Sequence, residues 1–223
     1  MLVKGTPGTY AELVAAKEEN VFAIPDSLET AAAAAIGVPY KTAWWALVDM
    51  GGLKKGDTLL VQGAATATGQ ASLDIGRSLE AKVYATSRAD KVDKVRALGA
   101  EALEYDDPKV RELEANVVFE PIGADTFADS VEALAVEGAL VTPGAVGNPI
   151  VSFNLWTLLG KRARIQGIGS AQASRETMER LISLAGEGKL KPVIDRELLL
   201  EQVADAHRAI EARETFGEVI LRP

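Results

Sequence analysis

Residues 58–69 read TLLVQGAATATG, a short apolar run followed at once by a loop of small residues. The run Thr58–Val61 lies between Gly56-Asp57 and Gly63, which is typical of a buried β-strand. The residues from 68 to 79 then predict a helix. A strand that passes through a glycine-containing turn directly into a helix indicates a β-α unit of an α/β protein.

The same alternation of short apolar runs and helical patterns continues on both sides of this stretch. Further strands are predicted at residues 82–86, 116–119, 139–142, 164–167 and 216–221, and helices at 31–35, 41–50, 89–98, 126–135, 178–185 and 203–210. Gly37 and Pro39 are expected to interrupt the first of these helices. This alternation predicts β-α-β units and a doubly wound parallel sheet. Ligands of such sheets bind outside the carboxyl ends of the strands, so the residues that follow each strand form the candidate site.

Composition excludes several classes of function. The chain has 223 residues, with 24 Lys and Arg against 32 Asp and Glu, and the net charge of −8 argues against a nucleic-acid partner. There is no cysteine, which excludes disulfides, thiolate zinc sites and cysteine nucleophiles, and His207 is the only histidine. No apolar run reaches the roughly 18 residues of a membrane helix, and the N-terminus lacks a signal-peptide pattern. We therefore expect a soluble, cytoplasmic protein with no membrane partner.

The loop of residues 63–69 is suited to the pyrophosphate of a dinucleotide. Small residues let the backbone approach a ligand closely, and the helix N-terminus offers free N–H groups and the positive end of the dipole. The hydroxyls of Thr66 and Thr68 are candidate donors to phosphate oxygens. Of the G-x-G-x-x-G pattern only the last glycine, Gly69, is present, and Gln70 excludes a P-loop, which needs Lys there. A tight turn without a ligand is the alternative interpretation.

The end of the strand at residues 82–86 indicates which dinucleotide would bind. Ser87 and Arg88 follow it, and Lys91 lies one turn further on. No carboxylate is present there to accept a hydrogen bond from a ribose 2′-hydroxyl, whereas a hydroxyl and two cations suit a 2′-phosphate. Any dinucleotide is therefore predicted to be NADP(H). The alternative is a solvated, basic start of a helix.

Many stretches of the chain match one known family in order and spacing. They are residues 8–12, 21–25, 40–44, 55–61, 63–69, 98–100, 117–123, 125–127, 138–144, 188–192, 206–208 and 216–217. Through them the chain resembles the medium-chain dehydrogenase/reductase superfamily, specifically its zinc-free quinone oxidoreductase branch, over nearly its whole length. The resemblance implies a Rossmann fold, a homodimer, and NADPH-dependent hydride transfer to a quinone or an α,β-unsaturated carbonyl.

The resemblance also implies where the cofactor groups lie. The expected positions are Ala65, Thr66, Ala67 and Thr68 for the phosphates, Ser87, Arg88, Lys91 and Tyr105 for the 2′-phosphate, and Thr42, Ile122, Gly144 and Ala145 for the nicotinamide. No residue is assigned as catalytic and none as a metal ligand, because the cofactor itself carries the chemistry.

Two departures from the family pattern leave a second hypothesis open. Most of the family's GroES-like catalytic domain, which forms one wall of the substrate cleft, has no counterpart. We expect its remnant at residues 1–37, the dinucleotide-binding domain at 38–190, and a segment returning to the catalytic-domain side at 191–223. Glu218 stands where the family commonly has Lys. The chain is accordingly either such a reductase or a catalytically silent nucleotide-binding or structural module.

Overall fold

The computed structural model describes residues 1–169 and 173–223, which form two compact units. The first unit combines Met1–Lys41 with Ala173–Pro223, and the second comprises Thr42–Gln172. In this division, residues 173–190 group with the first unit. The domain boundaries expected after residues 37 and 190 stay a prediction.

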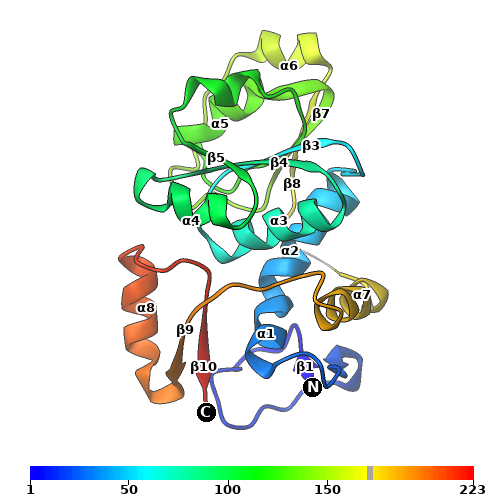
Figure 1. Cartoon of the computed structure of the whole chain (residues 1–223), viewed down its shortest axis with the longest axis vertical. Coiled ribbons are helices and arrows are strands. Elements are labelled where there is room, and N and C mark those ends of the chain that lie inside the picture. The colour runs from blue at the N-terminus through cyan, green and yellow to red at the C-terminus, as the bar shows by residue number, and fades with distance from the viewer. Residues whose placement is uncertain (170–172) are drawn as a thin grey trace. The chain divides into compact units, whose positions relative to one another are not determined.

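The second unit is built on a parallel six-stranded sheet (Figure 1). Its strands are β3 (Thr58–Val61), β4 (Lys82–Ser87), β5 (Glu101–Glu104), β6 (Ala115–Phe119), β7 (Leu134–Thr142) and β8 (Arg164–Gly167). Their order across the sheet is β5-β4-β3-β6-β7-β8, and all neighbouring pairs are parallel. The chain winds outward in opposite directions from the β3–β6 pair. This order confirms the predicted doubly wound α/β sheet.

Helices cover both faces of this sheet. The helical segments between residues 41 and 161 are α2 (Lys41–Trp44), η3 (Trp45–Met50), α3 (Ala67–Ser78), η4 (Ala89–Lys91), α4 (Val92–Ala97), η5 (Pro108–Glu112), α5 (Ala124–Glu132) and α6 (Leu155–Lys161). In Figure 1, α3 and α4 lie on one face, and α5 and α6 lie on the other. Leu60, Val118 and Leu140 of the central strands are fully buried in the core. Burial on both faces explains why these strands read as continuous apolar runs.

The first unit contains two small sheets and three α-helices. Its elements are β1 (Leu2–Val3), η1 (Glu18–Asn20), β2 (Val21–Phe22), α1 (Thr30–Ala35), η2 (Ile36–Tyr40), α7 (Arg175–Gly186), β9 (Ile194–Leu199), η6 (Leu200–Gln202), α8 (Val203–Glu211) and β10 (Glu218–Arg222). Strands β9 and β10 pair in parallel, and β1 and β2 pair antiparallel.

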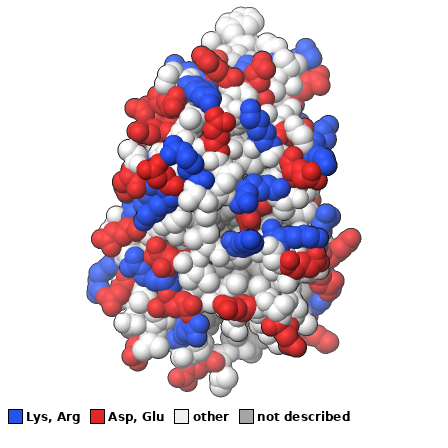
Figure 2. Space-filling view, in the orientation of Figure 1, with Lys and Arg blue, Asp and Glu red and all other residues white. Residues whose placement is uncertain are grey.

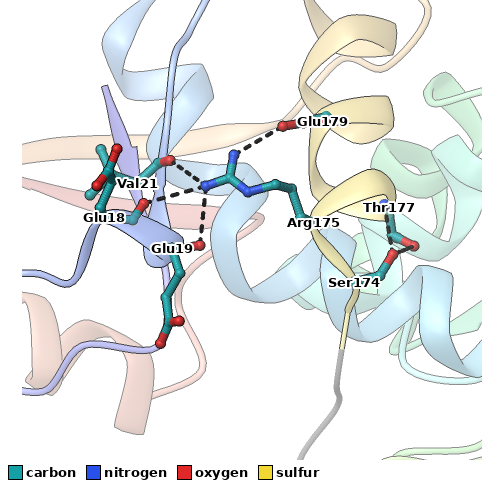
Figure 3. A network of polar contacts seen from close by, with 7 residues as sticks. All are labelled: Glu18, Glu19, Val21, Ser174, Arg175, Thr177 and Glu179. Carbon is teal, nitrogen blue, oxygen red and sulfur yellow. Dashed lines mark hydrogen bonds and ion pairs between the residues drawn. The ribbon is translucent and has the colours of Figure 1, made fainter.

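Arg175, the first residue of α7, joins distant parts of this unit (Figure 3). Its guanidinium donates to the backbone carbonyls of Glu18, Glu19 and Val21 at 3.2–3.3 Å. It also forms an ion pair of 3.0 Å with Glu179 one turn along the helix. The start of α7 is thereby attached to the N-terminal segment, although more than 150 residues separate them in sequence.

Some predicted elements differ from the structure. Gly37 and Pro39 do not interrupt the helix: the backbone continues from α1 into α2 through the π-helical segment η2, whose wider turn accommodates the proline ring. The helix predicted at residues 126–135 ends at Glu132, and β7 begins at Leu134. Strands β5 and β9 and helix α6 were not predicted, because they are short or half-exposed and lack a clear apolar period.

The described surface mixes charges of both signs. Figure 2 shows acidic and basic side chains interspersed over the face in view. Among the described residues, no helix has the length and apolar content needed to cross a membrane.

Candidate functional site

The parallel sheet brings most of the predicted site residues to one edge, where the strands end. The turn after β3 carries Ala65, Thr66, Ala67 and Thr68; the end of β4 and η4 carry Ser87, Arg88 and Lys91; Tyr105 follows β5; Ile122 follows β6; and Gly144 and Ala145 follow β7. Thr42 instead lies on α2 and does not follow a strand in the sequence. All of them belong to the second unit. The roles assigned to these residues stay predictions.

The close approach of α3 to the end of β3 depends on Gly69, in the first turn of α3. A Cβ added to Gly69 would lie 2.4 Å from the carbonyl oxygen of Gly63 and 2.8 Å from Cα of Ala64, so only glycine permits this approach of helix to strand. The hydroxyl of Thr66 accepts from the Gly69 N–H at 3.0 Å and donates to the Gly63 carbonyl at 2.9 Å. Thr66 is therefore the N-cap of α3, and its hydroxyl hydrogen is used inside the turn.

Gln70 in the first turn of α3 is a residue that sequence reasoning used only to exclude a P-loop. Its side chain is 4 % exposed, and neither its amide nitrogen nor its amide oxygen has a hydrogen-bond partner among the described residues. Burial of an amide is costly unless hydrogen bonds compensate for the lost water. A polar residue directly after a small-residue turn was the only sequence signal.

The basic residues after β4 have unequal surroundings. Ser87 is fully buried, and its hydroxyl donates to the Arg88 carbonyl at 3.2 Å. Arg88 is exposed at the edge, where its guanidinium forms a 2.9 Å ion pair with Asp90. Lys91 is buried. Sequence reasoning missed Asp90, the ion-pair partner of Arg88.

The loops after β6 and β7 are joined by backbone hydrogen bonds. The N–H of Val146 donates to the carbonyl of Pro121, and the N–H of Gly147 donates to that of Ile122, both at 2.9 Å. Gly123 has φ 102°, and a Cβ there would lie 2.4 Å from the carbonyl oxygen of Asn148. The two loops that carry the predicted nicotinamide contacts therefore form one surface, although they are far apart in sequence.

Comparisons with known proteins agree with this fold. A family model described as zinc-binding dehydrogenase matches residues 89–221. The quinone oxidoreductase-like protein 2 homolog of Nematostella vectensis is 31% identical over 98% of this chain, which spans 65% of that relative. A solved NAD-dependent alcohol dehydrogenase matches 97% of this chain and 65% of its own, at 33% identity and a TM-score of 0.88. A solved mycobacterial protein complexed with NADPH matches 93% of this chain and 69% of its own, at 26% identity and a TM-score of 0.82.

The fold and the comparisons define a Rossmann-type dehydrogenase domain. The chain belongs to the medium-chain dehydrogenase/reductase superfamily and is a quinone oxidoreductase-like member of it. It spans 65% of the length of the first relative and of the first solved structure described above.

The family description mentions zinc, but this chain offers few zinc ligands. It has no cysteine and one histidine. Within residues 1–169 and 173–223, no group of three His, Cys, Asp or Glu side chains is arranged to hold a metal ion. The zinc-free assignment stays a prediction.

Proposed function

We propose that this chain is the cofactor-binding part of an NADPH-dependent oxidoreductase that reduces a quinone or an α,β-unsaturated carbonyl. The observation that carries the proposal is the carboxyl edge of the sheet. There a glycine-dependent helix N-terminus, a basic cluster and a pair of joined loops lie at consecutive strand ends. Membership of the quinone oxidoreductase-like branch supports the class of reaction.

The residues present fit a dinucleotide. The amides of Ala67 and Thr68 belong to the first turn of α3, where N–H groups have no intrahelical acceptor and suit the pyrophosphate. The close approach at Gly69 and the unpartnered amide of Gln70 are further features of a ligand site. The nicotinamide, when bound, supplies a hydride to an electrophilic carbon of the substrate. The chain's own residues bind and orient the cofactor for that step.

The basic cluster favours NADPH over NADH. Ser87, Arg88, Lys91 and Tyr105 would surround the 2′-phosphate. Solved structures of both kinds resemble this chain, one described as NAD-dependent and one holding NADPH. Arg88, exposed at the edge of the sheet, is the feature of this chain that supports NADPH. For the nicotinamide, we propose contacts from Thr42, Ile122, Gly144 and Ala145.

Calorimetry with NADPH, and with NADH for comparison, tests the proposal. Binding with a clear preference for NADPH is expected. An assay of NADPH oxidation with a quinone and with an enone then tests the reaction. If neither dinucleotide binds, the cofactor proposal is wrong. Binding without turnover would support the second candidate, a nucleotide-binding module, which is favoured by the loop's single remaining family glycine.

We also propose that the protein forms a homodimer. Leu155, Trp156 and Leu159 of α6 are all more than half exposed, with Trp156 at 80%. Strand β8 lies at the end of the sheet order, so its outer edge has no strand partner among the described residues. Large exposed apolar side chains on one short helix are typical of an interaction surface.

A further inference from the structure

A network of buried polar side chains lies beneath the carboxyl edge of the sheet. Its members are Thr86 at the end of β4, Gln62 directly after β3, Glu120 directly after β6, and Thr126 and Ser130 on α5. Each of the five is at most 2% exposed. They thus connect three strands and one helix inside the second unit.

The hydrogen bonds of this side-chain network all run in one direction, from Thr86 toward Glu120. The Thr86 hydroxyl donates to Oε1 of Gln62. Nε2 of Gln62 donates to the Ser130 hydroxyl at 3.0 Å, and Ser130 in turn donates to Oε2 of Glu120 at 2.6 Å. Because each hydroxyl has a single hydrogen, each residue of the network orients the next one. The network ends at the carboxylate of Glu120.

The carboxylate of Glu120 accepts hydrogen bonds from several directions. Its Oε1 accepts from the backbone N–H groups of Ile122 at 2.8 Å and Gly123 at 3.1 Å, and its carboxylate also accepts from the Thr126 hydroxyl at 2.9 Å. These partners are all donors, which suits an ionised carboxylate. Burial raises the pKa of Glu120 above its ordinary value, and the hydrogen bonds from Ser130, Gly123, Ile122 and Thr126 offset this rise only in part. The carboxylate therefore shapes the turn that carries Ile122.

This network reaches the loops that follow β3, β4 and β6, to each of which cofactor contacts are assigned. Gln62 directly precedes the turn that begins at Gly63, Thr86 directly precedes Ser87 and Arg88, and Glu120 lies two residues before Ile122. Backbone ladders already join β3 to β4 and to β6. Buried polar side chains often stabilise less than apolar ones of the same size, so stability alone is a weak reason for this network.

We propose that Glu120, acting through Ser130 and Gln62, is a positioning residue for the dinucleotide: its network holds the three loops in the arrangement that binds the cofactor. The inference rests on the proposed function. Preorganisation of this kind lowers the cost of ordering the loops when ligand binds.

Two neighbouring residues of α5 provide a matched test. Ser130 lies in the network, whereas Val131 is fully buried in the apolar core. The Ser130→Ala and Val131→Ala variants are both expected to lower the melting temperature. Only Ser130→Ala, which removes the acceptor of Gln62 Nε2 and one donor to Glu120, is expected to weaken NADPH binding, by about tenfold in Kd. Glu120→Gln is expected to weaken binding in the same way.

The outcomes separate this inference from the proposed function. Calorimetry of the whole chain gives Kd, and thermal unfolding gives stability. If the unaltered chain binds neither NADPH nor NADH, both proposals are wrong. If it binds NADPH and the Ser130→Ala and Glu120→Gln variants bind it equally well, the positioning role alone is overturned. Weakening by Val131→Ala in proportion to its loss of stability would also overturn it.

Discussion

Arg88 is the residue on which the preference for NADPH depends most directly. Its guanidinium is exposed at the carboxyl edge and shared with Asp90. We expect Arg88→Glu to weaken NADPH binding at least about tenfold, because a charge-assisted hydrogen bond is lost and a repulsive carboxylate replaces it. The affinity for NADH, which lacks the 2′-phosphate, should change little. Calorimetric titration with each dinucleotide measures both effects.

Lys94→Glu is the matched control for this change. It alters the net charge equally, and Lys94 lies on α4, the helix that follows Arg88 and η4. Its effect on NADPH should be small. Equal weakening of NADPH and NADH by Arg88→Glu would contradict the assignment of the 2′-phosphate to this cluster.

At the scale of single residues, sequence reasoning identified residue types but not their partners. It placed Arg88 at a strand end correctly, and it missed the ion pair to Asp90 only two positions later. It treated the Thr66 hydroxyl as a phosphate donor, whereas that hydroxyl caps α3. Side-chain partners depend on rotamers and on backbone turns, which residue spacing alone does not determine.

Among the elements, α3 depends most on one small residue. A Cβ at Gly69 would overlap backbone atoms of Gly63 and Ala64, which are not free to move aside as a side chain would be. Gly69→Ala should therefore destabilise the chain by about 3 kcal/mol, as overpacking does at its upper range. Its melting temperature should fall by roughly 6–12 °C, and dinucleotide binding should be lost. Thermal unfolding and calorimetry measure these effects.

Gly37→Ala is the control for that substitution. An added Cβ at Gly37, in η2, meets no atom within 4 Å. The melting temperature of this variant should equal that of the unaltered chain or exceed it, since alanine restricts the unfolded chain. A Gly69→Ala variant as stable as the unaltered chain would show that the turn after β3 adjusts freely.

Strand β10 contains a carboxyl group whose ionisation opposes folding. Burial raises the pKa of Glu218, the first residue of β10, above its ordinary value of 4.5. The protonated form is thus favoured by folding, so its contribution to stability is complete below pH 4.5 and is lost as the pH rises through the folded-state pKa. Glu218→Gln should raise the melting temperature at pH 7 and have little effect near pH 4.

The exposed Glu211 of α8 provides the control. Glu211→Gln also removes one negative charge, but from a side chain that lies in solvent. Melting curves of both variants between pH 4 and 8 test the expectation. A stabilisation by Glu218→Gln that is the same at every pH would contradict the role of ionisation.

At the scale of the whole molecule, α6 is the surface to test for self-association. We expect the chain to sediment as a dimer and Trp156→Glu to shift it to a monomer, because a charge in an apolar interface has no partner there. Leu199→Glu places the same charge at another exposed apolar position, on β9, and should leave the dimer intact. Sedimentation velocity distinguishes the two. A monomeric unaltered chain would overturn the homodimer proposal.

Local sequence patterns are sufficient to predict the parallel sheet, the glycine turn and the strand ends at which the candidate residues lie. Apolar runs and glycines are local signals, and strands such as Thr58–Val61 and Arg164–Gly167 occur at the predicted residues. The continuous helix through Pro39 and the unpredicted β5 and β9 depend on packing by distant segments, which local periodicity does not record.

The contacts between side chains, in contrast, depend on the three-dimensional fold. The Glu120 network joins residues up to 68 positions apart, and the loop of Ile122 meets that of Gly147 through backbone bonds. Such contacts form because β3, β4 and β6 lie side by side in the sheet and because buried polar groups require partners. A sequence states which residues can form hydrogen bonds, whereas the fold selects the partner of each.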